Sequence, residues 1–173
     1  GSQRGQFAAL SSATRGLFGG GQGSGGSAPT YSIEYITIAS SGNGTDFGNL
    51  SQSFVMQLSG SANSTRGIWW HGAIQPLYTA RNVIEYSTIA SLGNVVDFGD
   101  NTADCRGNGS AANSTRSLCA LGFSGGVVNT VTYITIASTS NASDFGDLTT
   151  SDRYKAAGFS SSTQAFFAAG GGG

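Results

Sequence analysis

Charged residues are scarce in this chain: Asp, Glu, Lys and Arg make up 10% of its 173 residues, against about a quarter in an ordinary soluble domain. The formal net charge is -1 at pH 7, so there is no basic surface to hold a phosphate backbone or an anionic lipid headgroup. Long apolar runs are also missing, since no stretch approaches the roughly 18 residues that a membrane-spanning helix needs. We therefore expect no nucleic acid partner and no membrane insertion.

Residue types that build catalytic and metal centres are few as well. The single histidine, His71, does not assemble into a recognisable Ser-His-Asp set, and no pair of carboxylates stands apart from the regular pattern of the chain. Cysteine pairs with metal-ligand spacing and glycine motifs that bind nucleotides are both missing. The sequence therefore predicts a protein that is not an enzyme, with no cofactor and no metal site.

The chain has two cysteines, Cys105 and Cys119. The segment between them is typical of two short strands and a turn, so we expect the two residues to face each other across one hairpin. Two interpretations stay open. They form a disulfide if the protein works outside a reducing cytosol, or they are two small buried side chains.

The abundant residues are glycine, with 28 copies, and small hydroxyl and amide residues, and they follow a repeat of roughly 50 residues. One marker of the repeat is Tyr-x-Thr-Ile-Ala-Ser, which begins at Tyr35, Tyr86 and Tyr133. Each copy is followed by an Asp-Phe-Gly triplet. The triplets are Asp46, Phe47 and Gly48; Asp97, Phe98 and Gly99; and Asp144, Phe145 and Gly146.

A second marker, Ser/Asn-x-Thr-Arg, alternates with the first. It ends at Arg15, Arg66 and Arg116, and a fourth copy ends at Gln164. Both ends of the chain therefore lie in the same phase of the repeat. We divide the single repeat domain, residues 1–173, into a half unit at 1–30 and units at about 31–80, 81–130 and 131–173.

Apolar and polar residues alternate within each unit with the period of a β-strand. Tyr35 and Thr37 fall on one face of such a strand, while Ile36 and Ile38 fall on the other. Clusters of Gly, Asn, Asp and Ser bound these runs, as turns require. The sequence predicts an all-β fold of about three and a half antiparallel units, with a β-solenoid or fibre-like stack as the alternative.

The order of features in a unit resembles the blade of kelch-type β-propellers. The likeness rests on glycine pairs after a hydrophobic strand, Gly19–Gly20 and Gly125–Gly126, and on the pairs Glu34–Tyr35 and Glu85–Tyr86. The chain departs from the kelch pattern in lacking its tryptophan and in having Trp70–His71 where a glycine pair is expected. The resemblance implies units shaped like propeller blades.

A likeness that covers nearly the whole chain is to tandem repeats of large virion proteins of marine tailed bacteriophages. Tyr133–Leu148 and Ser11–Gly20 carry it. It implies a structural or host-adhesion component of a phage particle, such as a fibre, decoration or tail-associated protein, in the virion or outside the cell. Its partners would be itself or other virion proteins, and host surface glycans. The alternative function is a secreted carbohydrate-binding, lectin-like module.

Trp69, Trp70 and His71 stand out because other units have small residues in this place. Two aromatic rings and an imidazole are able to form a platform on which a sugar stacks, with the ring nitrogens hydrogen-bonded to its hydroxyls. The alternative is that the tryptophans fill a contact between units or subunits. The three residues are the candidate ligand site of the sequence.

The recurring Asp-Phe-Gly and Thr-Arg residues are interpreted as structural, because a residue type repeated in every unit serves the unit. We expect each Asp to cap a turn, the following Phe to be buried and the Gly to provide the turn conformation. Arg15, Arg66 and Arg116 are expected to bind carbonyl groups or the Asp of a neighbouring unit.

About three and a half blades are too few for a closed propeller, which has four to eight. We therefore expect the repeat to be completed by self-association, either with two chains closing one propeller or with copies adding end to end. The alternative is that these residues are an ordered portion of a longer repeat protein.

Overall fold

The computed structural model describes residues 4–23, 30–149, 154–168 and 170–171. These residues form strands, turns and bends only, and their sheets are antiparallel, which confirms the predicted all-β class. No helix among them has the length and hydropathy of a membrane span.

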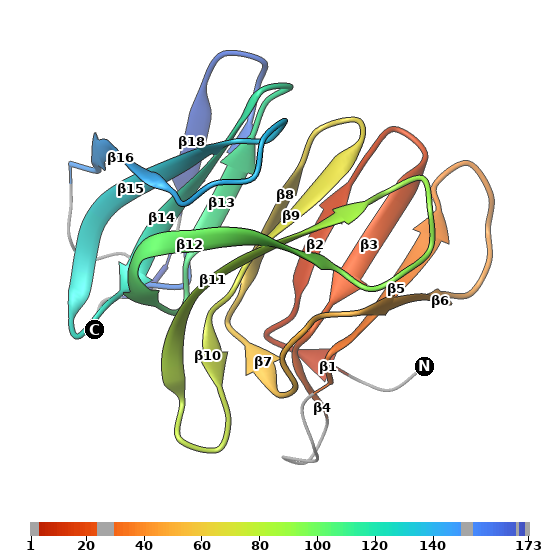
Figure 1. Ribbon diagram of the computed structural model, residues 1–173, viewed down its shortest axis with the longest axis horizontal. Helices are drawn as coiled ribbons and strands as arrows, with labels where there is room; N and C mark the ends of the chain where they lie inside the picture. Colours follow the sequence, from red (N-terminus) through yellow and green to blue (C-terminus); the bar gives the residue numbers. More distant parts are fainter. Residues whose placement is uncertain (1–3, 24–29, 150–153, 169, 172–173) are drawn as a thin grey trace.

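Three four-stranded meanders follow one another along the chain, and a single hairpin comes after them (Figure 1). We call them the first, second and third units and the half unit. The first unit contains β2 (Ala8–Ser11), β3 (Arg15–Gly19), β5 (Ser32–Thr37) and β6 (Thr45–Asn49). The second contains β8 (Ser59–Ala62), β9 (Arg66–Trp70), β11 (Thr79–Thr88) and β12 (Val96–Cys105). The third contains β13 (Gly109–Ala112), β14 (Arg116–Phe123), β15 (Val127–Thr135) and β16 (Ser143–Asp147), and the half unit contains β17 (Ala157–Ser160) and β18 (Ala165–Ala168).

Two short strand pairs lie at the lower end of the units in Figure 1. One pair is β1 (Arg4–Gly5) with β4 (Gln22–Gly23), and the other is β7 (Val55–Met56) with β10 (Ala73–Ile74), which also extends the sheet of the second unit.

The structure corrects the phase of the repeat. Each meander begins with the hairpin that carries the Thr-Arg marker, and the Tyr-x-Thr-Ile strand pairs with the second strand of that hairpin as its third strand. Among the described residues the half unit therefore lies near the carboxyl end of the chain, as the hairpin β17–β18, while β2 and β3 belong to the first unit. Strand pairing, rather than the Tyr-x-Thr-Ile marker, determines where each sheet starts.

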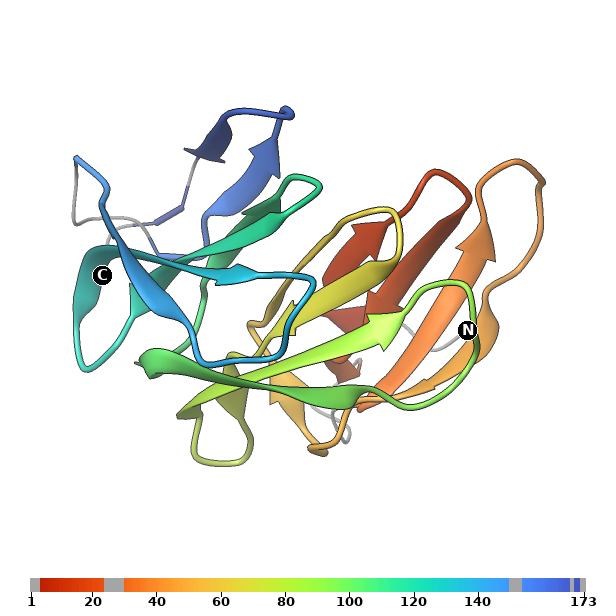
Figure 2. The same cartoon turned by 45° about the horizontal axis from the view of Figure 1, so that its top comes forward.

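The first strands of successive units, β2, β8, β13 and β17, lie side by side in a row (Figures 1 and 2). Small residues allow this close approach. A Cβ atom added to Gly60 would lie 3.1 Å from the carbonyl oxygen of Ala9, and one added to Gly109 would lie 2.7 Å from that of Ala156. Larger side chains in this row would push the units apart.

A ladder of backbone hydrogen bonds runs through all the units just before their first strands. The N–H of Gln57 donates to the carbonyl of Gln6 at 3.0 Å, that of Gly107 donates to Gln57 at 3.0 Å, and that of Lys155 donates to Gly107 at 2.8 Å. All four residues have φ between 56° and 62°, a left-handed conformation that costs free energy for a residue other than glycine. The repeated geometry fixes how each unit sits on the one before it.

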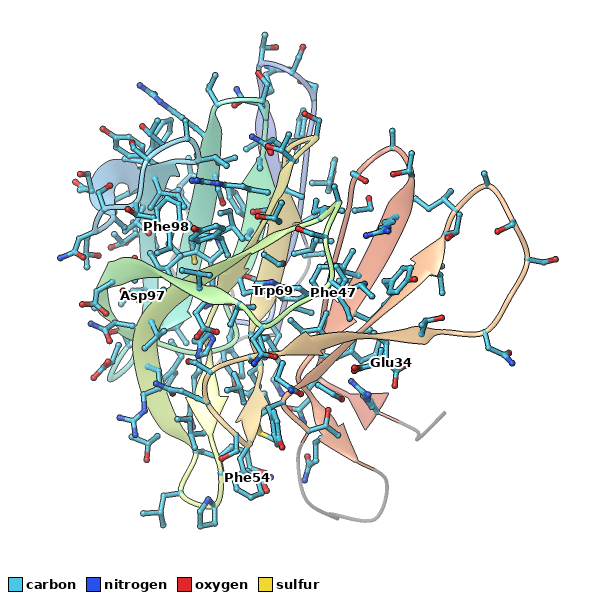
Figure 3. The ribbon with its side chains drawn as sticks, turned by 45° about the vertical axis from the view of Figure 1, so that its right-hand side comes forward. Glu34, Phe47, Phe54, Trp69, Asp97 and Phe98 are labelled. Atoms are coloured by element: carbon cyan, nitrogen blue, oxygen red, sulfur yellow. The ribbon has the colours of Figure 1, made fainter. Side chains whose placement is uncertain are left out.

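The apolar core divides into two clusters, one at each boundary between complete units. Adjacent tryptophans of β9 contribute to different clusters. Trp69 belongs to the cluster that holds Phe47 of the first unit, both labelled in Figure 3, and Trp70 belongs to the cluster that holds Ile136 of the third. Burial of an indole removes on the order of 200 Å² from water, or roughly 5 kcal/mol of transfer free energy. Stacking of units, rather than any single unit, therefore provides the core.

Candidate functional site

The arginines of the Thr-Arg marker join one unit to the next. Nη1 of Arg15 donates to the carbonyl oxygen of Ile89 in the following unit at 2.7 Å, and Nη1 of Arg66 donates to that of Ile136 at 2.7 Å. Each guanidinium also lies over a tyrosine ring of its own unit, 4.8 Å from the centroid of Tyr35 and 4.5 Å from that of Tyr86. These are the inter-unit carbonyl contacts expected from the sequence.

The Asp-Phe-Gly triplets lie inside the fourth strands, not at turns, which corrects one expectation. The strand register shifts next to Gly48 and Gly99, whose φ angles of 147° and 144° belong to a β-bulge. Asp46 and Asp97 are exposed. Within the described residues, a hydrogen bond from the backbone to an acid of the triplets is found only in the third unit, where Asp144 accepts from Gly146 at 3.2 Å. The triplet therefore marks a bulge that re-aims the strand.

The phenylalanines of the first two triplets are buried at unit boundaries, as expected. Phe47 and Phe98 meet the tyrosines of their own units edge to face, with ring centroids 6.1 Å and 6.0 Å apart. Ile89 of the following unit joins the cluster that holds Phe47, and Ile136 joins the one that holds Phe98. One Ile of the Tyr-x-Thr-Ile marker therefore fills the space in front of the preceding unit.

In the second and third units, the loop before the fourth strand docks on the preceding unit. At the first boundary the N–H of Gly93 donates to Phe47 at 2.8 Å and the N–H of Asn49 donates to Oδ1 of Asn94 at 3.0 Å. At the second boundary the N–H of Asp100 donates to Oδ1 of Asn141 at 3.0 Å. The same asparagine position thus serves both boundaries.

The candidate ligand residues Trp69, Trp70 and His71 are all buried. The indole N–H of Trp69 donates to Oγ of Ser87 at 2.9 Å, and that of Trp70 donates to Oγ of Ser117 at 2.9 Å. Neither indole offers a face to solvent, so the sugar-stacking alternative does not fit this structure and the packing alternative does.

His71 belongs to a buried polar cluster that the sequence analysis missed. Its Nε2 lies 2.6 Å from Oε2 of Glu85, and the backbone N–H of Ser51 donates to Oε1 of the same carboxylate at 3.2 Å. Nδ2 of Asn108 donates to the carbonyl oxygen of His71 at 2.9 Å. The available signal was that Glu85 repeats Glu34 in a strand whose neighbours are mostly apolar.

The two cysteines face each other across a unit boundary, which corrects the single hairpin expected for them. Cys105 lies on β12 of the second unit and Cys119 on β14 of the third, and both are buried free thiols. A hydrogen bond with the Cys119 thiol lowers the pKa of Cys105, while burial raises the pKa of Cys119. The amide of Asn108 donates to the sulfur of Cys105 at 3.4 Å.

A cavity of about 420 Å³ opens between the third unit and the half unit. Its apolar lining includes Leu118, Val131, Phe145 and Phe167. We call this cavity the open groove. Arg116 also lines the open groove. Its guanidinium lies 4.9 Å from the centroid of Tyr133, so the stacking seen in the other units is present here too.

The described part of the chain contains no group of three or more His, Cys, Asp or Glu residues placed to hold a metal ion. The candidate site is therefore the series of unit boundaries and the open groove that ends it. Neither the comparison with protein-family models nor that with curated proteins finds a match for this chain.

Proposed function

We propose that this chain is a non-enzymatic structural or host-adhesion component of a bacteriophage particle, of the fibre, decoration or tail-associated kind. The observation that carries the proposal is the reuse of one set of contacts at successive boundaries. Arg15 and Arg66 bind the following unit in the same way, and the residues of both sequence markers are used for stacking. A protein whose recurring residues serve stacking is suited to an extended mechanical role.

The chemically versatile side chains support the same proposal. His71, Glu85, Cys105 and Cys119 are all buried and contact protein groups. A general base or a nucleophile has to reach its substrate, which these four side chains do not in this arrangement. The likeness to tandem repeats of tailed-phage virion proteins provides the biological setting, with itself or other virion proteins as partners.

Host-surface glycans are proposed as ligands only for the case in which the chain is a host-adhesion component of the particle. Their contacts would come from exposed loops rich in hydroxyl and amide groups, such as the exposed loop at Asn43. The lectin-like alternative depended on Trp69 and Trp70, and their burial leaves no observation in its favour.

Quantitative mass spectrometry of purified particles tests the proposal. The chain should band with particles of the phage that encodes it, in a fixed copy number per particle, and should resist washing with high salt because its surface is nearly uncharged. A non-structural protein of the same phage serves as the control for contamination. Recovery of the chain only in the soluble lysate, at the level of that control, would refute a virion role.

A further inference from the structure

The phenylalanine position that is buried at the inner boundaries is exposed at the carboxyl-terminal end of the row. The phenylalanine of the triplet is 2% exposed at Phe47 and Phe98 but 53% exposed at Phe145. The isoleucine that covers it is 2% exposed at Ile89 and 0% exposed at Ile136. Phe145 thus lacks the isoleucine that its counterparts receive from a following unit.

The polar groups around Phe145 also lack the contacts that their counterparts make at the inner boundaries. Arg116 occupies the place of Arg15 and Arg66, yet within the described residues its guanidinium has no carbonyl acceptor. A Cβ atom on Gly99 would meet the carbonyl oxygen of Ser140 at 2.6 Å, whereas one on Gly146 would meet nothing within 4 Å. The space that a docked loop fills in front of the second unit is therefore empty in front of the third.

The half unit contains the first two strands of a meander, β17 and β18. Among the described residues β18 pairs only with β17, whereas β3, β9 and β14 each pair with a strand on both sides. The free edge of β18 borders the open groove, where Ala165 and Phe167 line the cavity opposite Leu118 and Phe145. In the part of the chain that the structure describes, this unit has no third or fourth strand.

We propose that the open groove is a binding site for a β-hairpin with the third- and fourth-strand pattern of this same repeat, donated by another chain. The open groove has the same lining positions as the boundaries that already join the units. Binding of a hairpin there is a property beyond the proposed role in a particle. The described hairpins of this type, β5–β6, β11–β12 and β15–β16, are each paired within their own unit and so are not free to fill the groove.

The inner boundaries specify how the hairpin docks. Its first strand adds to the edge of β18, as β15 adds to β14, and backbone hydrogen bonds provide affinity. Its isoleucine, in the place of Ile136, enters the groove beside Phe145, and the carbonyl of that residue accepts from Arg116. Its asparagine, in the place of Asn141, accepts from the N–H of Asp147, as Asn141 itself accepts from Asp100.

A synthetic peptide of residues 127–148, with the wild-type sequence or with Ile136→Asp, is the probe. Fluorescence anisotropy measures its binding to the intact chain. The wild-type peptide should bind, and the Ile136→Asp peptide should bind at least about tenfold more weakly because a charge would enter an apolar groove. In the chain, Phe145→Ser should weaken binding by a similar factor.

Ile38→Ser in the chain is the matched control, because Ile38 is also an exposed apolar residue, 52% exposed, but lies in the first unit. It should leave peptide binding unchanged. Equal weakening by Ile38→Ser and Phe145→Ser would overturn the proposal, since the peptide would then be adhering to apolar surface in general.

A second measurement covers the case in which the free peptide does not adopt a hairpin. Residues 127–148 are fused after Gly173 through a flexible linker, and Tm is compared with that of a fusion carrying the Ile136→Asp sequence. The proposal expects a higher Tm for the wild-type fusion only, and no rise when the chain carries Phe145→Ser. Absence of both peptide binding and this rise in Tm refutes the site. Neither result depends on whether the chain is found in phage particles.

Discussion

The guanidinium of Arg15 donates a hydrogen bond to the carbonyl oxygen of Ile89, a residue 74 positions further along the chain, at 2.7 Å. Arg66 repeats this contact with Ile136 at the next boundary. The arginine belongs to the first hairpin of one unit, and its acceptor directly follows the third strand of the next unit. The hydrogen bond therefore fixes where that strand lies relative to the hairpin of the preceding unit. The stacking geometry is therefore encoded in side chains as well as in the backbone ladder.

Arg66→Gln should lower the free energy of unfolding by about 2 kcal/mol, because a charge-assisted hydrogen bond and the stacking on Tyr86 are both lost. Glutamine is the natural choice because Gln164 takes this place in the half unit. Urea titration followed by tryptophan fluorescence measures the change.

Arg116→Gln is the matched control, because Arg116 stacks on Tyr133 in the same way but is exposed and has no carbonyl acceptor among the described residues. Arg116→Gln should lower the free energy of unfolding by less than about 1 kcal/mol. Equal losses for the two variants would show that the carbonyl contact contributes nothing.

Gly99→Ala should destabilise the chain by about 3 kcal/mol or more. The residue has a φ of 144°, and its new Cβ would lie 2.6 Å from a backbone oxygen of Ser140, which is held in place by the docked loop. Thermal unfolding followed by circular dichroism reports the loss.

The same substitution at Gly146 separates the two causes. Its φ of 131° carries similar backbone strain, but no atom lies within 4 Å of the added Cβ. Gly146→Ala should cost only about 1 kcal/mol. A loss as large as that of Gly99→Ala would mean that strain alone, and not the neighbouring unit, demands glycine.

The sequence was sufficient to predict the strands and the repeat, because both depend on local patterns. Alternation around Ile36 and the recurrence of the Asp-Phe-Gly triplet are visible without any knowledge of pairing. The role of the arginines followed from the chemistry of guanidinium and carbonyl groups. The phase of the units did not follow, since the choice between two pairings of the same strands is made by long-range contacts.

The sequence also did not show which neighbours each side chain would contact. Trp69 and Trp70 are adjacent in the sequence, and a strand sends adjacent side chains to opposite faces. Only the presence of a unit on each side decides that both faces are buried. The cysteines were misplaced for a related reason, because sequence proximity favoured one hairpin while packing joined two units.

Glu85→Ala should lower the free energy of unfolding by about 3 kcal/mol. The substitution leaves Nε2 of His71 and the N–H of Ser51 without their acceptor in the interior, and an uncompensated buried polar group is costly. Guanidinium chloride titration measures the effect.

Glu34→Ala provides the comparison at the same place in the first unit. Glu34 pairs with Arg4 at 2.7 Å, but its side chain is 38% exposed. Its loss should cost about 1 kcal/mol or less, as for other exposed ion pairs. Equal losses in the free energy of unfolding for Glu85→Ala and Glu34→Ala would contradict the structural importance given to the buried pair of His71 and Glu85.

Cys105 and Cys119 should resist alkylation in the folded protein. Both thiols are buried, and burial raises the pKa of Cys119, so that little reactive thiolate forms there at about pH 8. The hydrogen bond from Cys119 lowers the pKa of Cys105, but its sulfur is covered by protein atoms and reacts only after opening of the boundary. We expect native rates at least about 100-fold below those of the unfolded chain, measured by iodoacetamide labelling and mass spectrometry.

Labelling after unfolding without reductant decides the state of the pair. Free thiols predict that both cysteines take up the label at once, whereas a disulfide would leave both unlabelled until reductant is added. Cys119→Ala shows whether the neighbour matters: with no side-chain donor left at this position, the pKa of Cys105 should rise towards its ordinary value, and its labelling should begin at higher pH in the native protein. An unchanged pH profile for Cys105 would mean that the two sulfurs do not interact across the boundary.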